Sequence, residues 1–231
     1  MHNTTRAGPA GLIISEQMNQ INTTNPEVSP APATAPSASA SPAPAAASHG
    51  GLADPGALGL GAFALTTFVL SMSNTGIVPS SVAVLGLALF YGGIAQVIAG
   101  IWELRNGNTF GATAFTSFGA FWLAFWYLES TGGNVAAGAA GMGTFLLAWT
   151  IFTVYMTVAA KNTNGSIFIV FVALSITFAL LAIGAYTGIT AIHQLGGWFG
   201  ILTALLAWYG SFAVVYNSTA GRAVLPVWPA K

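Results

Sequence analysis

Hydroxyl and amide side chains lie inside segments of this chain that are otherwise apolar enough to cross a membrane. Phe63, Thr67, Ser71 and Asn74 recur at intervals of four, four and three residues, which places them on one face of a helix. Thr66, beside Thr67, is a further candidate contact. Side chains of this kind donate and accept hydrogen bonds without carrying charge, so the stripe is suited to a small polar solute.

A second polar stripe lies between Asn108 and Gly119, where threonine, serine and glycine alternate with phenylalanine. Its candidate contacts are Thr113, Thr116 and Ser117. Thr150, Thr153 and Thr157 form a third stripe. Each hydroxyl has an alternative partner in the carbonyl four residues back on its own helix. A shared lining of one polar path would explain the three stripes together.

The remaining polar residues restrict the mechanism. Gln96 cannot be satisfied within its own helix, so we expect it to bind a neighbouring helix or a solute. The acids nearest the apolar segments, Glu103 and Glu129, lie at segment ends, where we expect Glu103 to form an interfacial pair or anchor with Arg105. Pumps usually carry ionisable groups at the membrane midplane, and this sequence has none there. His193 is expected to be interfacial.

Several functional classes are excluded by absent residues. The chain has no cysteine, no metal-ligand spacing and no phosphate-binding GxxxxGK[ST] loop, so we predict no catalytic residue, no metal site and no cofactor. The chain is therefore not expected to be an enzyme. Its formal net charge of zero argues against nucleic acid as a partner.

Composition indicates the environment that these residues occupy. Only 4% of the 231 residues are charged and 55% are hydrophobic, whereas a soluble domain carries about a quarter charged residues. Apolar segments of about twenty residues match the thickness of a bilayer core, where helices satisfy their own backbone groups. We predict an all-α integral membrane protein with six transmembrane helices in a compact bundle.

The chain divides near residue 50. Residues 1–49 include an Ala/Pro/Ser-rich tract and are predicted to be a disordered cytoplasmic tail. Residues 50–231 are predicted to be one transmembrane transport domain, because its short, Asn- and Gly-rich turns make consecutive helices neighbours. The expected spans are Leu58–Asn74, Val82–Leu104, Phe110–Leu128, Ala136–Ala160, Ile167–Tyr186 and Leu195–Tyr216.

The basic residues indicate the orientation. With six spans, all five fall on one side of the membrane, and they are Arg6, Arg105, Lys161, Arg222 and Lys231. Lys and Arg near span ends favour the cytoplasmic side, so both termini are expected to be cytoplasmic.

Four motifs make the chain similar to a known family. They are Asp54–Leu60 before the first span, Phe90–Gln96, Asn108–Gly119 continuing to Trp122, and Gly221–Pro226. Over roughly residues 53–228 the chain resembles the acetate uptake transporter family, whose bacterial members are called succinate–acetate permeases. The family's entry motif corresponds here to Asp54, Pro55, Leu58, Gly59 and Leu60, with Asp in place of the family's Asn and Ala57 in place of a Pro.

The resemblance implies a plasma-membrane homohexamer with a separate pore in each protomer. Each pore would pass acetate, with succinate as a second candidate, by a channel or a proton-linked carrier mechanism. It also implies a pore constriction formed by Phe63, Leu174 and Phe118, the last at a position where the family has Tyr. The alternatives are a pore for small neutral solutes, or a membrane-embedded enzyme or scaffold without transport activity.

Overall fold

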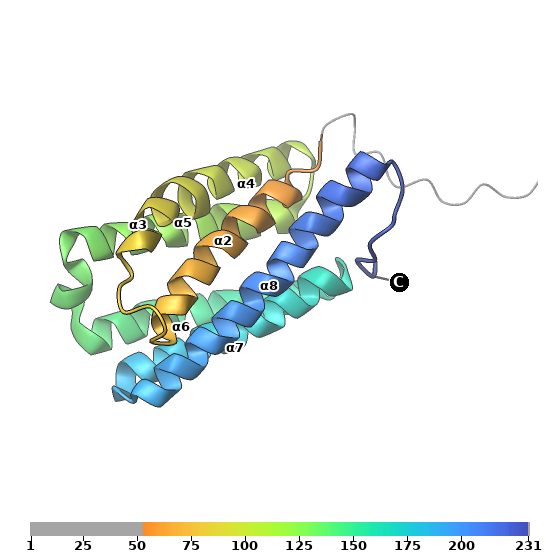
Figure 1. Cartoon of the computed structure of the whole chain (residues 1–231). Helices are drawn as coiled ribbons and strands as arrows, with labels where there is room; N and C mark the ends of the chain where they lie inside the picture. The colour runs from red at the N-terminus through yellow and green to blue at the C-terminus, as the bar shows by residue number, and fades with distance from the viewer. Residues whose placement is uncertain (1–52, 231) are drawn as a thin grey trace, which may run out of the picture. The chain divides into compact units, whose positions relative to one another are not determined.

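The computed structural model describes residues 53–230 as a bundle of helices (Figure 1). No strand occurs within this part of the chain. Its elements are α2 (Gly56–Asn74), α3 (Val82–Leu89), η1 (Phe90–Ala95), α4 (Gln96–Arg105), α5 (Thr109–Thr131), α6 (Gly133–Ala160), α7 (Gly165–Thr187) and α8 (Thr190–Ala220). The predicted disordered tail, residues 1–49, lies outside the described residues.

The predicted spans correspond to these elements. The second span is a continuous run of α3, η1 and α4, and the largest boundary difference is at α8, which begins at Thr190 rather than Leu195. Within the described residues, five helices are long and apolar enough to cross a membrane: α2, the α3–η1–α4 run, α6, α7 and α8. The fold class of an all-α, multi-pass membrane protein is therefore confirmed. The remaining predicted span, Phe110–Leu128, corresponds to α5, which is long enough to cross a membrane but does not reach the hydropathy of the other five, so the predicted number of six is not confirmed.

Asparagine and glycine fix the helix ends. The Oδ1 atom of Asn108 accepts a hydrogen bond from the backbone N–H of Gly111 at 3.0 Å, which caps α5. Asn164 caps α7 in the same way through the N–H of Ile167 at 2.9 Å. At the other end of α5, Gly132 has φ 73°, a left-handed conformation that glycine adopts at little cost. These residues therefore act as the turn formers that the sequence indicated.

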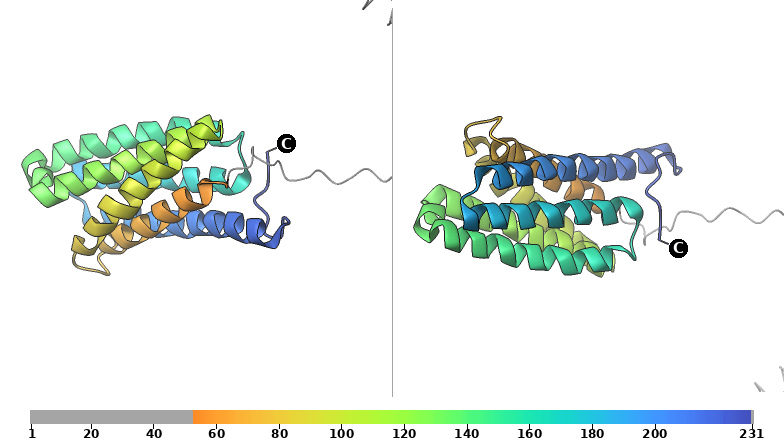
Figure 2. Two further views of the ribbon diagram at one scale, coloured as in Figure 1. Left: turned by 90° about the horizontal axis from the view of Figure 1, so that it is seen from above. Right: turned by 90° about the horizontal axis from the view of Figure 1, so that it is seen from below.

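The helices run alongside one another, and each reverses the direction of the one before it, with α3, η1 and α4 counted as a single run (Figure 2). The most extensive packing is between α2 and α8, α7 and α8, α6 and α7, and α4 and α5. Small residues permit the close approaches: a Cβ on Gly197 of α8 would lie 2.6 Å from the backbone nitrogen of Thr75 after α2. Glycine thus permits α8 and the end of α2 to pack closely.

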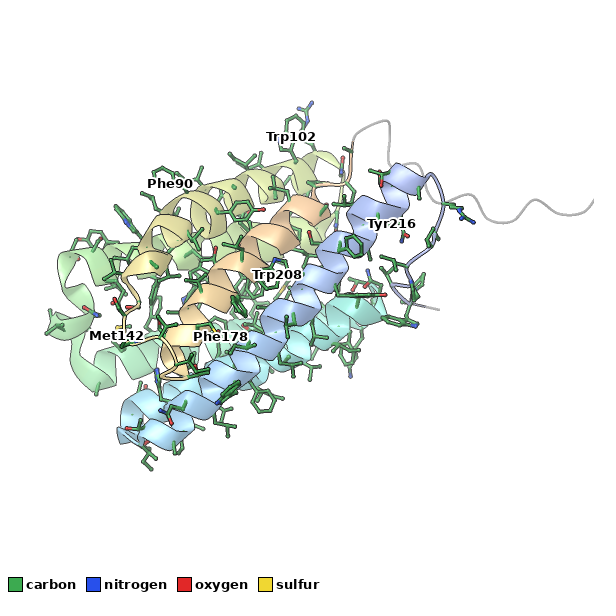
Figure 3. All side chains as sticks on the ribbon, viewed as in Figure 1. Phe90, Trp102, Met142, Phe178, Trp208 and Tyr216 are labelled. Carbon is green, nitrogen blue, oxygen red and sulfur yellow. The ribbon has the colours of Figure 1, made fainter. Side chains whose placement is uncertain are left out.

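Large apolar side chains cover the outside of the bundle, while rings also fill its centre. Phe90 and Trp102 point away from the helices (Figure 3) and are 66% and 48% exposed. Phe178, in contrast, is buried at 4% exposure within the central cluster of hydrophobic residues. Apolar side chains on both the outer surface and the interior are typical of a bundle surrounded by lipid.

Candidate functional site

Two cavities of similar size occupy opposite ends of the bundle. The first has a volume of about 450 Å³ and is lined by the end of α2, the α5–α6 connection and the start of α8, including Asn74, Glu129 and His193. The second, of about 460 Å³, is lined by the start of α2 and the α4–α5 and α6–α7 connections, including Glu103 and Asn164. Since α2 begins at one cavity and ends at the other, the two lie along the length of the bundle.

Phe63 of α2 and Leu174 of α7 line both cavities, so they lie between them. Phe118 of α5 lines the second cavity, and its ring centroid is 5.7 Å from that of Phe63. On the other side Phe118 stacks on Phe178 of α7, which lines the first cavity, with centroids 6.4 Å apart and an interplanar angle of 8°. We call Phe63, Phe118, Leu174 and Phe178 the partition. The structure thus brings the three predicted constriction residues together.

The stripe on α2 faces the first cavity. Phe63, Thr67, Ser71 and Asn74 all line it, as their spacing predicted for one helical face. Asn74 Oδ1 lies 3.3 Å from Nε2 of His193, which therefore also faces the cavity. The Oγ1 atom of Thr67 is buried and has no hydrogen-bond partner among the described residues.

Trp122 is a cavity residue that the sequence analysis did not single out. Its side chain is 2% exposed, it lines the first cavity, and its Nε1 has no hydrogen-bond partner in the described part of the chain. A buried indole N–H usually finds a partner, so a Trp in the middle of an apolar span was itself a signal. With Thr67, it gives this cavity two unpartnered groups that are able to donate.

A carboxylate lies at each end of α5, and each is held by the asparagine five residues further on. Asn134 Nδ2 donates to Glu129 in the first cavity at 2.9 Å, and Asn108 Nδ2 donates to Glu103 in the second at 2.9 Å. Each cavity therefore has an acidic side chain among its lining residues.

The position of Glu103 differs from the prediction. Expected at the membrane interface beside Arg105, its side chain is instead 3% exposed and forms part of the cavity wall. Residues two apart on a helix do not face each other, so Glu103 faces the bundle while Arg105 is exposed.

Gln96 lines the second cavity at the point where the backbone of its span changes. The π-helix η1 ends there, and the Gln96 backbone N–H bonds to the carbonyl of Tyr91, five residues back. The wider turn shifts every later residue around the helix axis, and π-helical turns are frequent at functional sites. The Gln96 side chain is 1% exposed, and its Oε1 has no partner within residues 53–230.

The first cavity contains a second backbone irregularity. Within α6, Gly138 has φ 65° and ψ −176°, a conformation almost restricted to glycine, and it breaks the helix where it lines the cavity. A Cβ at Gly138 would meet nothing within 4 Å, so its role is in the backbone rather than in packing.

The second predicted stripe lies on the other face of α5. Thr113 is exposed, Thr116 and Ser117 are half-buried, and none of the three lines either cavity. Thr116 packs against Gly100 of α4. The aromatic residues Phe118 and Trp122 lie on the opposite face of α5, which lines the cavities. Aromatic rings, rather than hydroxyl groups, occupy the space between α2, α5 and α7.

Other predicted hydroxyls bond to their own helices. Thr66 donates to the carbonyl of Ala62 at 2.8 Å and packs at Gly92, outside both cavities. Along α6, Thr150, Thr153 and Thr157 each donate to the carbonyl four residues back. The alternative reading of these threonines therefore holds.

The entry motif forms the start of α2 at the second cavity. Asp54 Oδ1 accepts from the N–H of Gly56 at 2.8 Å, and the Pro55 carbonyl accepts from the N–H of Gly59 at 3.0 Å. Asp54 and Leu60 line the second cavity, whereas Leu58 is 40% exposed. A Cβ on Gly59 would lie 2.6 Å from the ring of Phe115, so the motif also joins α2 closely to α5.

Comparison with known proteins matches residues 37–230 to the GPR1/FUN34/yaaH family. The succinate-acetate/proton symporter SatP of Escherichia coli (strain K12) is 40% identical over 179 residues, which cover 76% of this chain and 95% of that protein. The solved structure of the bacterial acetate channel SatP matches with a TM-score of 0.73 and 40% identity, covering 76% of this chain and 99% of the other.

A eukaryotic relative is equally similar in sequence. The ammonia transport outward protein 2 of Saccharomyces cerevisiae (strain ATCC 204508 / S288c) is 40% identical over 202 residues, which cover 83% of this chain but 66% of the yeast protein. The match thus spans slightly less than two thirds of the yeast relative. The resemblance seen in the motifs is confirmed, and the chain belongs to the GPR1/FUN34/yaaH family.

Proposed function

We propose that this protein transports small monocarboxylates across a membrane, mainly acetate, with succinate as a second substrate. One observation carries the proposal: two polar-edged cavities at opposite ends of the bundle meet at Phe63 and Leu174. The relatives described as a succinate-acetate/proton symporter and as an acetate channel support the choice of solute.

The dimensions and chemistry of the path suit a small acid. Each cavity, at 450 to 460 Å³, is large enough for acetate together with several waters, since a water takes up about 30 Å³ in the liquid. The partition consists of hydrocarbon side chains. A solute therefore crosses it with little of its hydration shell, which favours small solutes with few polar groups.

The arrangement in the membrane is part of the same proposal. We infer that α5 is the sixth span, within a transport domain of residues 50–231 in the plasma (inner) membrane. Arg105 is the last residue of α4, and Lys161 and Arg222 come after α6 and α8; all three helices end at the second-cavity end of the bundle. Basic residues near span ends favour the cytoplasmic side of a membrane. This end of the bundle, together with both termini, is therefore cytoplasmic. Following the family resemblance, we propose a homohexamer with one pore per protomer.

Labelled-acetate uptake into proteoliposomes, with and without an imposed pH gradient, tests the function. We expect protein-dependent uptake above that of empty vesicles. Uptake that accumulates acetate only with an inward proton gradient would favour a carrier, and uptake indifferent to the direction of the gradient would favour a channel. No uptake above empty vesicles would contradict the proposal.

A pore for ammonia is the second candidate, favoured by the name of the yeast relative. Uptake of labelled methylammonium by the same vesicles tests it directly. Faster uptake of methylammonium than of acetate would reverse the assignment.

A further inference from the structure

A short segment at the start of α6, residues 133–137, lies between two glycines with left-handed backbone. Gly132 has φ 73°, and Gly138 has φ 65° with ψ −176°. A Cβ built on either glycine would meet nothing within 4 Å. Hinges are a few positions at the ends of elements that absorb changes of φ and ψ, and glycine has the widest choice of both angles. The backbone and its surroundings therefore allow a hinge at each end of the segment.

The remainder of α6 is fixed to α7 a short distance beyond the second glycine. Thr144 Oγ1 lies 2.9 Å from the hydroxyl of Tyr186, and a Cβ on Gly143 would lie 2.8 Å from the Tyr186 ring. Met142, labelled in Figure 3, is half-buried and lines the first cavity. Residues 135–140, in contrast, are exposed. Regions with few buried contacts open locally at the lowest cost, so motion should be confined to the part of α6 before Gly143.

A single hydrogen bond from a side chain joins the segment to α5. Asn134 Nδ2 donates to Glu129 Oε1 at 2.9 Å, and within the described residues no other side-chain hydrogen bond connects residues 133–137 to another helix. Asn134 Oδ1 accepts from the N–H of Val135 at 2.8 Å, so both ends of the amide are held. Both Asn134 and Glu129 are half-buried. Water therefore weakens this charge-assisted bond, and it can break and reform.

The segment lies where the first cavity meets the outside of the bundle. Val135 is 81% exposed and also lines the cavity, so it lies on the rim. Asn134 and Gly138 line the same cavity. Ser71 of α2 lines it too, but is only 3% exposed and thus lies deeper. The α5–α6 connection is at one end of the bundle (Figure 1), as a gate at that end would be.

We propose that residues 133–137 form a gate on the first cavity. Gly132 and Gly138 are its hinges, and the hydrogen bond from Asn134 to Glu129 holds it closed. The inference rests on the proposed transport function and adds a moving barrier to the partition. When the hydrogen bond breaks, the gate turns away from the rim and a solute enters the cavity. Asn134 and Glu129 are positioning residues here, because they act through the position of the gate.

The chain has no cysteine, so a single introduced thiol reports access to the cavity. Ser71→Cys places that thiol below the gate, and its rate of alkylation by iodoacetamide, a small uncharged reagent, measures opening. Asn134→Leu removes the donor at similar size. Loss of one hydrogen bond should raise the alkylation rate about three- to tenfold. The measurement does not require transport, so it tests the gate separately from the function.

A double-mutant cycle distinguishes the hydrogen bond from general loosening. Glu129→Leu should raise the alkylation rate of Ser71→Cys by a similar factor. The double variant should react no faster than either single variant, because one hydrogen bond is lost only once. Asn162→Cys is the control reporter, since Asn162 lines the second cavity. Its alkylation rate should be the same in all four backgrounds.

Tying the gate closed tests its part in transport. A short bifunctional thiosulfonate should bridge Glu129→Cys and Asn134→Cys, whose parent side chains are in hydrogen-bond contact. Bridging should abolish the protein-dependent acetate flux of this double variant in proteoliposomes, and a reductant should restore it. A monofunctional thiosulfonate, which leaves the two positions unlinked, should not abolish the flux.

Three results would overturn the inference. Equal alkylation of Ser71→Cys with and without Asn134→Leu would show that the hydrogen bond does not hold the gate. An equal rise at Asn162→Cys would show that the whole bundle had loosened. Unchanged flux after bridging would show that solute does not pass the gate. Absence of flux in the wild-type protein would instead contradict the transport function, whereas the alkylation rates would still report on opening.

Discussion

Shortening Leu174 should open the partition between the two cavities. Leu174 is 3% exposed and is one of two residues that line both cavities. Leu174→Ala removes three carbon atoms at this point, where a solute would otherwise lose its water. If the wider gap lets the solute keep one hydrogen bond to water, the barrier falls by about 1–3 kcal/mol. Since 1.36 kcal/mol corresponds to a tenfold change in rate, acetate flux should rise about 5- to 150-fold.

The same substitution also creates a cavity in a packed core, so stability must be separated from flux. Leu to Ala changes in soluble cores cost about 2–5 kcal/mol. Leu206→Ala is a suitable control, because Leu206 of α8 packs against the same hydrophobic core but lines neither cavity. Initial rates should be normalised to the folded protein recovered after size-exclusion chromatography.

Solute size makes this measurement more specific. In Leu174→Ala the fluxes of propionate and butyrate should rise by a larger factor than the flux of acetate. Leu206→Ala should leave the order of the three fluxes unchanged. Equal effects of the two substitutions, or a flux in Leu174→Ala no higher than in the wild type, would refute the role of Leu174 between the cavities.

Three further substitutions test the backbone that holds the cavities. Gly138→Ala, at φ 65°, should cost about 1–3 kcal/mol and lower the melting temperature in detergent more than the same change at Gly86, where a Cβ meets nothing within 4 Å. Asn217→Ala removes three hydrogen bonds to residues 224–225, each of which contributes about 0.5–1.5 kcal/mol. The substitution should therefore expose the C-terminal segment to protease, and an unchanged cleavage rate would contradict this. Asn108→Ala removes both the α5 cap and a donor to Glu103, so it should destabilise by more than the about 0.5–2 kcal/mol of a cap alone. Asn108→Ser, which keeps a cap acceptor but has no amide donor, should be less stable than the wild type and more stable than Asn108→Ala.

Helix positions and turns were predictable because local chemistry determines them. Apolar length identified the spans, and the Asn and Gly residues between them identified the turns, where Asn108 and Asn164 cap the following helices. These signals depend on a few neighbouring residues. The packing of α2 was also accessible from sequence, since its polar stripe has a single helical period and all its members line the first cavity.

The two backbone irregularities were not predictable in the same way. The π-helix η1 widens one turn of its span, and Gly138 breaks α6 at a kink. Glycine in an apolar segment serves close packing as readily as it serves such a break, and the difference depends on what the neighbouring helices leave open. The burial of Glu103 was unpredictable for the same reason, because the direction in which its side chain points depends on how η1 rotates α4.

The hydroxyl stripes show where periodicity stops being informative. A stripe defines a face of a helix, but the opposite face has the same period, and on α5 the larger aromatic side chains occupy the interior. The neighbouring residues Thr66 and Thr67 show the difference between a hydroxyl that packs within the bundle and one that lines a cavity. Thr66 bonds to the carbonyl of Ala62 and packs at Gly92, while Thr67 has no partner and lines the first cavity. Successive helical residues are about 100° apart, so the two side chains meet different neighbours. Among the described residues, four buried side-chain polar atoms have no hydrogen-bond partner: those of Thr67, Trp122 and Gln96 belong to residues that line a cavity, whereas Thr116, which carries the fourth, lies outside both cavities. A missing partner therefore marks a candidate solute contact only where the residue also lines a cavity.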